Sequence, residues 1–279
     1  MSTWFITGAS RGLGAAIARH ALSQGDNVVG TARSAQAVTD ALGSSQRVLP
    51  VALDVTDAAA ARAAVTSATD TFGAIDIVVN NAGRALIGAL EEMTEDQIRN
   101  QFELNVFGVI NVIRAALPIL RAQRLGTIVN ISSAAGILGF PASSIYNSSK
   151  FAVEGLTEGL RVDLAPLGIR VFAIEPGMFR TDFLSPSTVW VAENNGAIAD
   201  YQGTPALDQV AQLSDIDGTQ DGDPDKLAAL LYDVATATTA APPTRLPVGP
   251  DAVTLYEQRT ARDAAEFEPW RVRAASTSY

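Results

Sequence analysis

Short apolar runs and longer amphipathic stretches alternate through the first two thirds of the chain. Continuous apolar runs of about four to eight residues are typical of buried strands, and apolar positions repeated every three or four residues are typical of helices. The runs predict six strands, at Thr3–Thr7, Asn27–Thr31, Arg47–Leu53, Ile75–Asn80, Gly126–Ser132 and Ile169–Ile174. Because helical patterns separate most of the strands, we expect an α/β fold with a three-layer, doubly wound parallel sheet.

The helical patterns lie at Ala15–Ser23, Ala35–Leu42, Asp57–Phe72, Ile98–Arg121 and Ile145–Leu164. Thr94 is followed by two acidic residues, which indicates that the fourth helix begins there. Gly108 and Pro118 are expected to interrupt this helix. One side of this helix carries the apolar residues Phe102, Val106, Val109, Ile113 and Leu117. Three further apolar residues lie elsewhere on it, namely Phe107, Ile110 and Leu120. A sheet covers one face of a helix, so a second apolar face predicts a partner helix.

The pattern changes after residue 181. Residues 182–222 mix apolar side chains with Gly, Pro, Asn and Asp, which is typical of a mobile flap over a substrate, although a floppy insertion has the same composition. Asp223-Pro224 predicts the start of a helix that runs from Asp225 to Ala235. A strand at Arg245–Val248, a helix at about 251–268 and a loose tail after Trp270 complete the chain.

Composition fits one domain over residues 1–279, with a flap at about 182–222 and a C-terminal helix and tail at about 251–279. With 47% hydrophobic residues, the chain can build a substantial core. The N-terminal region lacks a basic segment and an apolar stretch long enough for export, and no run of about 18 uncharged apolar residues occurs. We therefore expect a soluble, cytoplasmic protein.

Charge and residue usage exclude several classes of function. The formal net charge is −10 and the isoelectric point about 4.6, which argues against nucleic acid and anionic membranes as partners. The chain has no cysteine and one histidine, His20. It therefore lacks the ligands for thiolate metal sites and for sites with two histidines, and we expect no metal. His20 is also the only base for a Ser-His-Asp triad, and it lies in a helical run that suits a surface or packing role.

Three glycines follow the first strand. Gly8, Gly12 and Gly14 stand in the turn that leads from this strand to the first helix. Glycine at such a turn lets backbone N–H groups approach a pyrophosphate, to which the helix N-terminus adds partial positive charge. An ordinary tight turn would also explain them, but the alternation of strands and helices that follows favours a dinucleotide site.

Tyr146 and Lys150 stand four residues apart, so in a helix their side chains share one face. A neighbouring ammonium favours a phenolate and lowers the pKa of a tyrosine, which is otherwise near 10. Ser133 ends the preceding strand-like run, where its hydroxyl can point into a cleft above the sheet. A tyrosine and a lysine at this spacing also occur as surface side chains, so the glycine turn strengthens the prediction of a catalytic site.

Six motifs together give a resemblance to a known family. They are TGASRGLG at 7–14, NNAG at 80–83, Asn105, Ser133, YNSSK at 146–150 and PG at 176–177. In this order and spacing they resemble the short-chain dehydrogenase/reductase family, over roughly residues 2–181. The EPGMFRTDF and GDPDKLAALL segments further resemble its single-domain branch of hydroxysteroid-dehydrogenase-like ketone reductases. The resemblance implies a Rossmann fold and a homodimer or homotetramer.

The resemblance also implies roles for individual residues. Tyr146 would be the general acid or base, Lys150 would lower its pKa and bind the nicotinamide ribose, Ser133 would hold the substrate oxygen, and Asn105 would anchor a water linked to Lys150. From its residues alone, Asn105 reads as a polar side chain that bonds helix backbone. The implied cofactor-binding residues are Gly8, Ser10, Arg11, Gly12, Leu13, Gly14, Arg33, Asp54, Val55, Asn80, Ala82, Gly83, Tyr146, Lys150, Pro176, Gly177 and Thr181.

The second strand and the glycine turn narrow the cofactor. In dinucleotide folds an acid at the end of this strand binds the free ribose 2′-hydroxyl, whereas an arginine accommodates a 2′-phosphate. Ala32 stands where the acid is expected, Arg33 follows it, and Arg11 adds a cation within the turn. Two solvated arginines would look the same, but their placement with a missing acid predicts NADP(H).

The substrate pocket is expected to be apolar. The family resemblance implies that six residues surround the carbonyl group of the substrate, namely Leu138, Phe140, Phe179, Phe183, Leu184 and Trp190. Arg180 is the only cation among them, so the lining predicts a ring-shaped or long-chain ketone rather than a small keto acid. The same residues could instead pack the flap against the sheet.

Two other functions remain open. One is an epimerase or dehydratase of the nucleotide-sugar branch, although that branch usually spaces its glycines G-x-x-G-x-x-G. The other is a nonenzymatic NADP-sensing regulator, although such proteins commonly lose the tyrosine or lysine that this chain keeps. Because a fold alone does not fix a function, the intact set of site residues favours an oxidoreductase.

Overall fold

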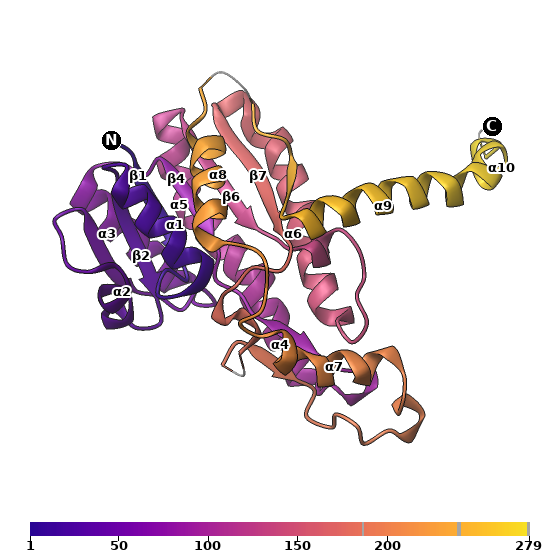
Figure 1. Cartoon of the computed structure of the whole chain (residues 1–279). Helices are drawn as coiled ribbons and strands as arrows, with labels where there is room; N and C mark the ends of the chain where they lie inside the picture. The colour runs from indigo at the N-terminus through magenta and orange to yellow at the C-terminus, as the bar shows by residue number, and fades with distance from the viewer. Residues whose placement is uncertain (186, 239–240, 278–279) are drawn as a thin grey trace.

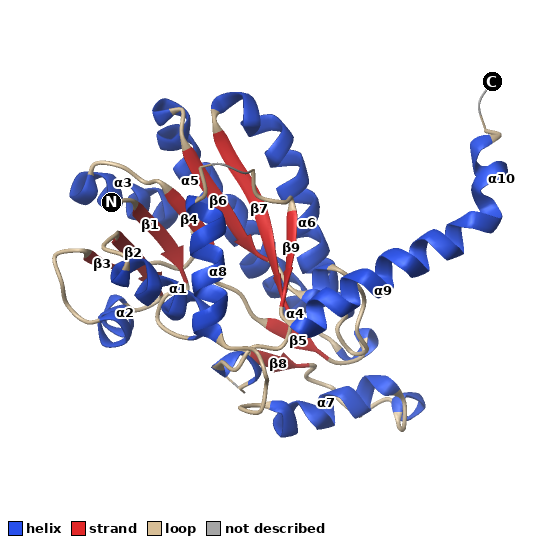
Figure 2. Ribbon diagram, turned by 45° about the horizontal axis from the view of Figure 1, so that its top comes forward, coloured by secondary structure: helices blue, strands red, loops and turns tan. Residues whose placement is uncertain are grey.

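The computed structural model describes residues 1–185, 187–238 and 241–277. Its framework is a seven-stranded parallel sheet in the order β3-β2-β1-β4-β6-β7-β9, with helices on both faces (Figures 1 and 2). The strands are β1 (Thr3–Thr7), β2 (Asn27–Ala32), β3 (Val48–Ala52), β4 (Ile77–Asn80), β6 (Gly126–Ile131), β7 (Ile169–Pro176) and β9 (Arg245–Val248). The predicted doubly wound single domain is confirmed.

One face of the sheet is covered by α1 (Gly12–Ser23), α2 (Ala35–Leu42) and α8 (Pro224–Thr236). Successive strand residues point to opposite faces, so Trp4 and Ile6 of β1 pack on this side. Trp4 stacks on Tyr232 of α8, with ring centroids 5.3 Å apart, and both side chains donate hydrogen bonds to the buried Asp26. These contacts fix α8 on the sheet.

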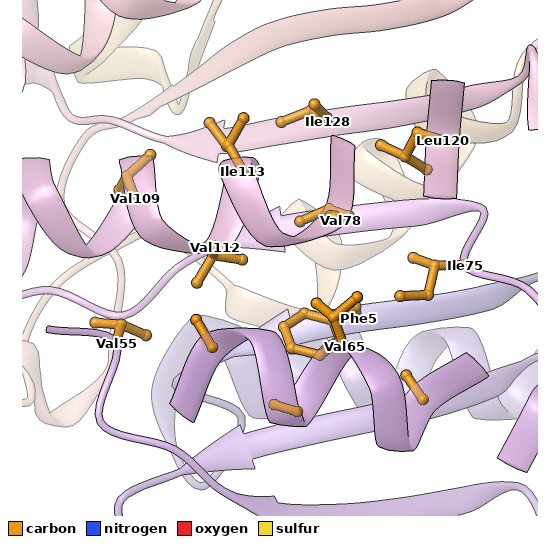
Figure 3. Close-up of a cluster of buried hydrophobic side chains, with 14 of the residues drawn as sticks. Phe5, Val55, Val65, Ile75, Val78, Val109, Val112, Ile113, Leu120 and Ile128 are labelled. Carbon is orange, nitrogen blue, oxygen red and sulfur yellow. The ribbon is translucent and has the colours of Figure 1, made fainter. Parts of the chain in front are cut away.

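The other face is covered by α3 (Ala58–Phe72), α5 (Gly108–Gln123) and α6 (Ser144–Leu164). Phe5 of β1 points to this side, between Val65 of α3 and the apolar row of α5 (Figure 3). The remaining residues labelled there are Val55, Ile75, Val78, Val109, Val112, Ile113, Leu120 and Ile128. Each face of the sheet therefore has its own core, and the strands are apolar on both sides.

The predicted long helix is two α-helices joined by a π-helical turn, which sequence reasoning missed. Helix α4 (Glu95–Phe102) has Thr94 and Gln97 as a reciprocal N-terminal cap, and the π turn Glu103–Phe107 leads into α5. Gly108 begins α5, whereas Pro118 lies inside α5 without interrupting it, contrary to expectation. Leu120, predicted for the second apolar side, is fully buried in the core, while Phe107 is 48% exposed.

The continuous helical stretch Glu95–Gln123 passes a length and composition test for a membrane span, alone among the helices of the described residues. Its most apolar window is 44% buried inside the protein, and the core helix of a soluble protein passes the same test. Length and composition are therefore weak grounds for a span here.

The segment predicted as a flap has secondary structure of its own. A second parallel sheet pairs β5 (Ala85–Ile87) with β8 (Val189–Val191), and the flap also contains α7 (Pro205–Ile216). Neither short strand was predicted, and residue 186 lies outside the described part of the flap. In Figures 1 and 2 this unit lies beyond the carboxyl ends of the main strands. The short 3₁₀ turns of the chain are η1 (Leu90–Glu92), η3 (Ala134–Gly136), η4 (Ala165–Leu167), η5 (Asp182–Leu184), η6 (Ala199–Tyr201) and η7 (Glu268–Trp270).

Residues 250–277 form a C-terminal arm that projects from the body of the protein (Figures 1 and 2). It consists of α9 (Pro250–Phe267), η7 and α10 (Arg271–Ala275). Asp251 accepts a hydrogen bond from the backbone N–H of Met178, and Arg259 donates to the carbonyl of Ile137, so the root of the arm is tied to loops above the sheet. The predicted loose tail is instead helical through Ala275, and residues 278–279 lie outside the described range.

Candidate active site

A cavity of about 740 Å³ lies at the carboxyl ends of the central strands, within the usual size range of ligand sites. Parallel strands bring their loops to this one edge of the sheet. It is lined by most of the predicted site residues, namely Gly8, Ser10, Arg11, Gly12, Leu13, Arg33, Asp54, Val55, Ala82, Gly83, Ser133, Tyr146, Lys150, Pro176, Gly177, Phe179, Thr181, Phe183, Leu184 and Trp190. Five other predicted residues, Gly14, Asn80, Asn105, Leu138 and Phe140, do not line it.

The glycine turn is held tightly against the end of β4. Gly8 has a φ of +67°, which favours glycine, and a Cβ on Gly14 would stand 2.3 Å from the Gly8 carbonyl oxygen. Gly14 therefore allows α1 to approach the turn rather than lining the cavity. Asn81, which the sequence analysis did not single out, donates through its side chain to the carbonyls of Thr7 and Gly8 at 2.9 and 3.1 Å.

Asn80 was expected beside the cofactor, and this expectation is wrong. Its side chain is 2% exposed and donates to Asn130 Oδ1 on β6 at 2.8 Å, while Asn130 donates to the hydroxyl of Thr157 on α6. The side chain thus points into the layer between the sheet and α6. The next residue, Asn81, faces the cavity because side chains alternate along a strand.

Three arginines, Arg11, Arg33 and Arg84, line the cavity. Arg11 donates to the hydroxyl of Ser187 at 2.8 Å, and Arg33 lies close enough to Arg84 to lower its pKa. Burial is the larger cause and brings the pKa of Arg84 to about 10, with Asp54 acting in the opposite direction. Arg84 remains charged at neutral pH, and sequence reasoning missed it because it lies just outside the NNAG motif.

Arg84 also joins the cavity to the second sheet. Its guanidinium carbon lies 3.0 Å from the ring centroid of Trp190 on β8, as a cation–π pair. Its backbone is fixed by Asn105, which donates to the Arg84 carbonyl at 2.9 Å and accepts from the Arg84 N–H at 3.1 Å. Trp190 therefore lies against a residue that is held by the π turn.

Asn105 occupies the middle of the π turn and is 2% exposed. Besides Arg84, its side-chain amide bonds the hydroxyl of Ser149 on α6 at 3.1 Å. Both ends of the amide are thus used within the protein, and the structure places Asn105 behind the cavity lining. The backbone that Asn105 bonds is that of Arg84, which lies outside the helices, so its contacts differ from the helix-backbone interpretation. Its bond to Ser149 suits a supporting role near Lys150.

Tyr146, Lys150 and Ser133 do meet at the cavity, as predicted. Tyr146 and Lys150 are only 8% and 7% exposed, and the lysine Nζ lies 5.8 Å from the centroid of the tyrosine ring. The Lys150 ammonium donates to the Ile131 carbonyl at 2.9 Å. Ser133 accepts a hydrogen bond from the Ala135 N–H at 3.1 Å, and it lies close enough to the Tyr146 phenol to act on the pKa of that group. Tyr146 and Lys150 lie on α6, and Ser133 lies in the turn that follows β6 and caps η3.

The pKa of the tyrosine differs from expectation. Burial raises the pKa of Tyr146 to about 12, although the neighbouring Ser133 acts in the opposite direction. The predicted lowering by Lys150 is absent because the ammonium donates to a backbone carbonyl and not to the phenol. Burial lowers the pKa of Lys150 to about 8, against the effect of the negative charge on Glu154.

The apolar side of the cavity comes from the flap. Phe183 and Leu184 pack with Val189 against Tyr146, and the ring centroids of Tyr146 and Phe183 are 6.2 Å apart. Phe140 belongs to this packed cluster, so its expected contact with the cavity is corrected to a role behind Tyr146. Leu138 is likewise set back, and its carbonyl accepts a hydrogen bond from the side chain of Asn147.

The family follows from comparison with known proteins. A family model described as short chain dehydrogenase matches residues 2–192. The chain belongs to this family. The matched residues end just past β8, so they include the glycine turn, Tyr146 and Lys150, and the start of the flap. The protein is therefore an oxidoreductase of that family, with a Rossmann fold.

Relatives of similar length support the assignment. Oxidoreductase BOA17 from Botryotinia fuckeliana is 40% identical to this dehydrogenase over 270 residues, 96% of each chain. A 3-ketodihydrosphingosine reductase from Bacteroides thetaiotaomicron is 35% identical over 252 residues, 90% of this chain and 89% of the relative. The crystal structure of a short-chain dehydrogenase from Streptomyces avermitilis matches with a TM-score of 0.88 and 37% identity over all of both chains.

Two solved structures similar to this dehydrogenase contain different cofactors. ElxO with NADP bound has a TM-score of 0.70 and 27% identity, and covers 88% of this chain and 95% of its own. A 3-ketoacyl-(acyl-carrier-protein) reductase from Brucella melitensis complexed with NADH has a TM-score of 0.71 and 25% identity, with the same coverage. A nicotinamide cofactor is therefore a property of the family, and the choice between the two differs among its members.

Proposed function

We propose that this dehydrogenase is NADP(H)-dependent and transfers a hydride between nicotinamide and the carbonyl or secondary alcohol carbon of a bulky, largely apolar substrate. The observation that carries the proposal is the convergence of Tyr146, Ser133 and Lys150 on one cavity, where Ser133 lies close enough to the phenol to lower its pKa and the Lys150 Nζ is 5.8 Å from the centroid of the tyrosine ring. A phenol that gives up a proton next to a second hydroxyl suits a carbonyl oxygen, which gains a proton on reduction.

The cavity fits a nicotinamide dinucleotide in shape and polarity. Gly14 brings the first turn of α1 against Gly8, so backbone N–H groups and a helix N-terminus are available to a pyrophosphate. Thr188 and Gln220 line the cavity and are 6% and 4% exposed, and their side-chain polar atoms lack a hydrogen-bond partner among the described residues. Buried polar groups are normally paired, so these atoms support a polar ligand.

The side chains at the adenosine end favour the phosphorylated cofactor. Ala32 stands where an acid would bind the ribose 2′-hydroxyl, and Arg11, Arg33 and Arg84 line the same cavity. Guanidinium groups bind phosphate oxygens through charge-assisted hydrogen bonds. Since solved relatives contain either NADP or NADH, the proposal rests on these side chains.

The protonation state of the site suits reduction. When bound, the nicotinamide cofactor supplies the hydride, and the chain's own task is to deliver a proton to the carbonyl oxygen. Tyr146 holds that proton at neutral pH, because its pKa is raised to about 12. Ser133 acts to lower this pKa and would so stabilise the phenolate that remains after proton transfer. Oxidation of an alcohol would need the phenolate first.

Lys150 has two roles in the proposal. Its ammonium lies 5.8 Å from the centroid of the Tyr146 ring, where its charge would stabilise the phenolate as it forms during proton transfer, and it is the group that would bind the nicotinamide ribose. Asn105 would support a water linked to Lys150, from its place in the π turn. Of the other cofactor residues, Asp54 and Val55 would meet the adenine, and Thr181 the nicotinamide carboxamide.

The substrate side of the proposal rests on the flap. Phe179, Phe183, Leu184 and Trp190 line the cavity, and two of them, Phe183 and Leu184, pack with Tyr146. Apolar area supplies binding energy at about 25 cal/mol per Å². The similarity to a 3-ketodihydrosphingosine reductase supports a ketone. We infer a ring-shaped or long-chain ketone rather than a small keto acid.

A single experiment tests the reaction and the substrate class. The protein and its Tyr146→Phe variant are assayed by loss of NADPH absorbance with steroid, aromatic, terpenoid and aliphatic ketones and with charged keto acids. We expect the protein to prefer bulky ketones and the variant to lose reduction by at least about a hundredfold, since only the proton donor is removed.

NADPH fluorescence titration provides the control, because the variant should keep its cofactor affinity. Near-normal turnover of the Tyr146→Phe variant would contradict the proposed proton donor. A higher kcat/KM for a small charged keto acid would contradict the apolar pocket.

A further inference from the structure

Two buried carboxyl groups lie behind Lys150. Glu154 is one helical turn beyond Lys150 on α6, and Glu175 lies on β7, next to Pro176 of the cavity lining. Their side chains are buried, with Glu154 1% and Glu175 0% exposed. Carboxylates are rarely buried to this degree unless they are paired, so these two residues need an explanation.

The surroundings of the two carboxyl groups supply few donors. Within the described residues, none of their four oxygens has an N–H or O–H partner in good hydrogen-bonding geometry. Arg245 of β9 lies 3.4 Å from Glu154 Oε2, but it also pairs with the half-exposed Glu158 at 2.9 Å. Because one guanidinium is shared among three acids, the negative charge of two ionised carboxylates at Glu154 and Glu175 would be only partly compensated.

A shared proton resolves this arrangement. Two facing carboxylates repel each other, whereas a protonated carboxyl can donate to its ionised neighbour. Ser132 Oγ and Glu154 Oε1 lie on the same side of Gly136, 2.6 and 3.1 Å from the place of a Cβ there. Glu175 and Ser132 are close enough to Glu154 to act on its pKa. One proton on the pair therefore removes one buried charge and gives a donor to the other.

We propose that Glu154 and Glu175 form a buried acid pair that shares one proton, and that its single negative charge, held on Glu154 next to Lys150, keeps the lysine protonated for the reaction. Both acids are positioning residues, because they act through Lys150 and do not line the cavity. This inference rests on the proposed function only for the role of the Lys150 ammonium.

The pKa shifts agree in direction. Burial, together with the charge of Glu154, raises the pKa of Glu175 to about 8. Burial also raises the pKa of Glu154, but Ser132, Arg245, Glu175 and Lys150 all oppose this. Glu154 is thus the acid that ionises. Its charge raises the pKa of Lys150, against the burial that lowers it.

The charged and titratable groups around Glu154 and Glu175 come from three elements, α6, β7 and β9. Lys150, Glu154 and Glu158 lie on α6, Glu175 on β7 and Arg245 on β9. Among these, Glu154 is the carboxylate that acts on Lys150. Glu158 is one turn farther from Lys150 and 55% exposed, so it is a matched control on the same helix.

The sequence makes a direct test possible, because Lys150 and Lys226 are the only lysines in the chain. Protein labelled with ¹³C-lysine will show two Cε signals, and the exposed Lys226 serves as the reference. Lys226→Arg assigns the spectrum. Titration by NMR then follows the Lys150 ammonium without substrate or cofactor.

We expect Glu154→Gln to lower the titration midpoint of Lys150 by about one pH unit, since a neighbouring opposite charge shifts a pKa by about one to three units. Glu158→Gln should leave the midpoint in place. Glu175→Gln should change it little, because the amide still donates to an ionised Glu154. The alkaline limb of kcat/KM should move with the midpoint in each variant.

An unchanged midpoint in a folded Glu154→Gln variant would overturn the proposal, as would an equal shift in Glu158→Gln. Circular dichroism shows whether each variant is folded, and the double variant Glu154→Gln/Glu175→Gln, which keeps neither charge, repeats the test if the single variant is unstable. If the protein reduces no ketone, the proposed function fails, but the NMR titration still decides whether the acid pair controls Lys150.

Discussion

Burial acts in opposite directions on the two ionisable side chains of the candidate site. It raises the pKa of Tyr146 to about 12 and lowers that of Lys150 to about 8. Lysine is charged below its pKa, so the ammonium is present at neutral pH and is lost first as the pH rises. The neutral phenol persists far beyond that point.

We therefore predict that ketone reduction is steady up to about pH 8 and declines above it, as Lys150 loses its proton. The measurement is kcat/KM against pH at saturating NADPH. At about pH 10, Tyr146 is still protonated and Lys150 is not. A profile that stays level up to this pH would show that the reaction does not need the ammonium of Lys150.

Cofactor choice is also decided by single residues. We predict that Arg33→Asp, combined with Arg11→Ser, shifts preference from NADPH to NADH by tens-fold or more, since each charge-assisted hydrogen bond contributes roughly 1.5 to 3 kcal/mol. The ratio of kcat/KM for the two cofactors measures it. Arg47→Asp, an exposed arginine outside the cavity, is the control. A wild-type preference for NADH would contradict the assignment.

The site residues were predictable where a motif fixes them. The spacing of Tyr146 and Lys150 and the glycine turn placed the cavity correctly. Asn80 was misplaced because a motif does not say which side a strand residue faces, and its neighbour Asn81 lines the cavity instead. The raised pKa of Tyr146 was missed since burial depends on the flap packed over it, a contact far apart in sequence.

At the scale of elements, the pairing of β5 with β8 connects the flap to the site. Trp190 on β8 lies against Arg84 and packs with buried residues such as Leu86 and Met93. We predict that Trp190→Ala raises KM for a bulky ketone several-fold and lowers Tm, because it removes a cation–π contact of about 0.5 to 2 kcal/mol and apolar packing.

Steady-state kinetics and thermal unfolding measure the two effects. Trp270→Ala is a matched control, because Trp270 is 59% exposed on the C-terminal arm. An unchanged KM in Trp190→Ala would separate β8 from substrate binding.

The long strands and helices were predictable from periodicity, often to within one or two residues. The two strands of the second sheet have three residues each and pair across about a hundred residues, so no local pattern marks them. The π turn was also missed, since one extra residue in a helical turn hardly disturbs an apolar repeat. Helix α1 begins at Gly12, earlier than expected, because the glycine turn forms its first turn.

At the scale of the whole molecule, we predict a homo-oligomer, a dimer or a tetramer. Leu120 turned out to be in the core, but Phe107 at the start of α5 and Phe151 on α6 are 48% and 39% exposed. Static light scattering at micromolar concentration should give a multiple of 29.2 kDa, and Phe107→Arg should reduce it. A mass of one chain throughout would reject the prediction.

The C-terminal arm changes how the size of this protein has to be measured. A compact chain of this length has a radius of gyration of about 19 Å, whereas the 18 residues of α9 alone extend about 27 Å. Such a projection adds hydrodynamic drag with little mass, so gel filtration will make even a single chain elute as a larger particle. Elution volume and scattered intensity will therefore disagree, and the difference between them measures the shape of the protein.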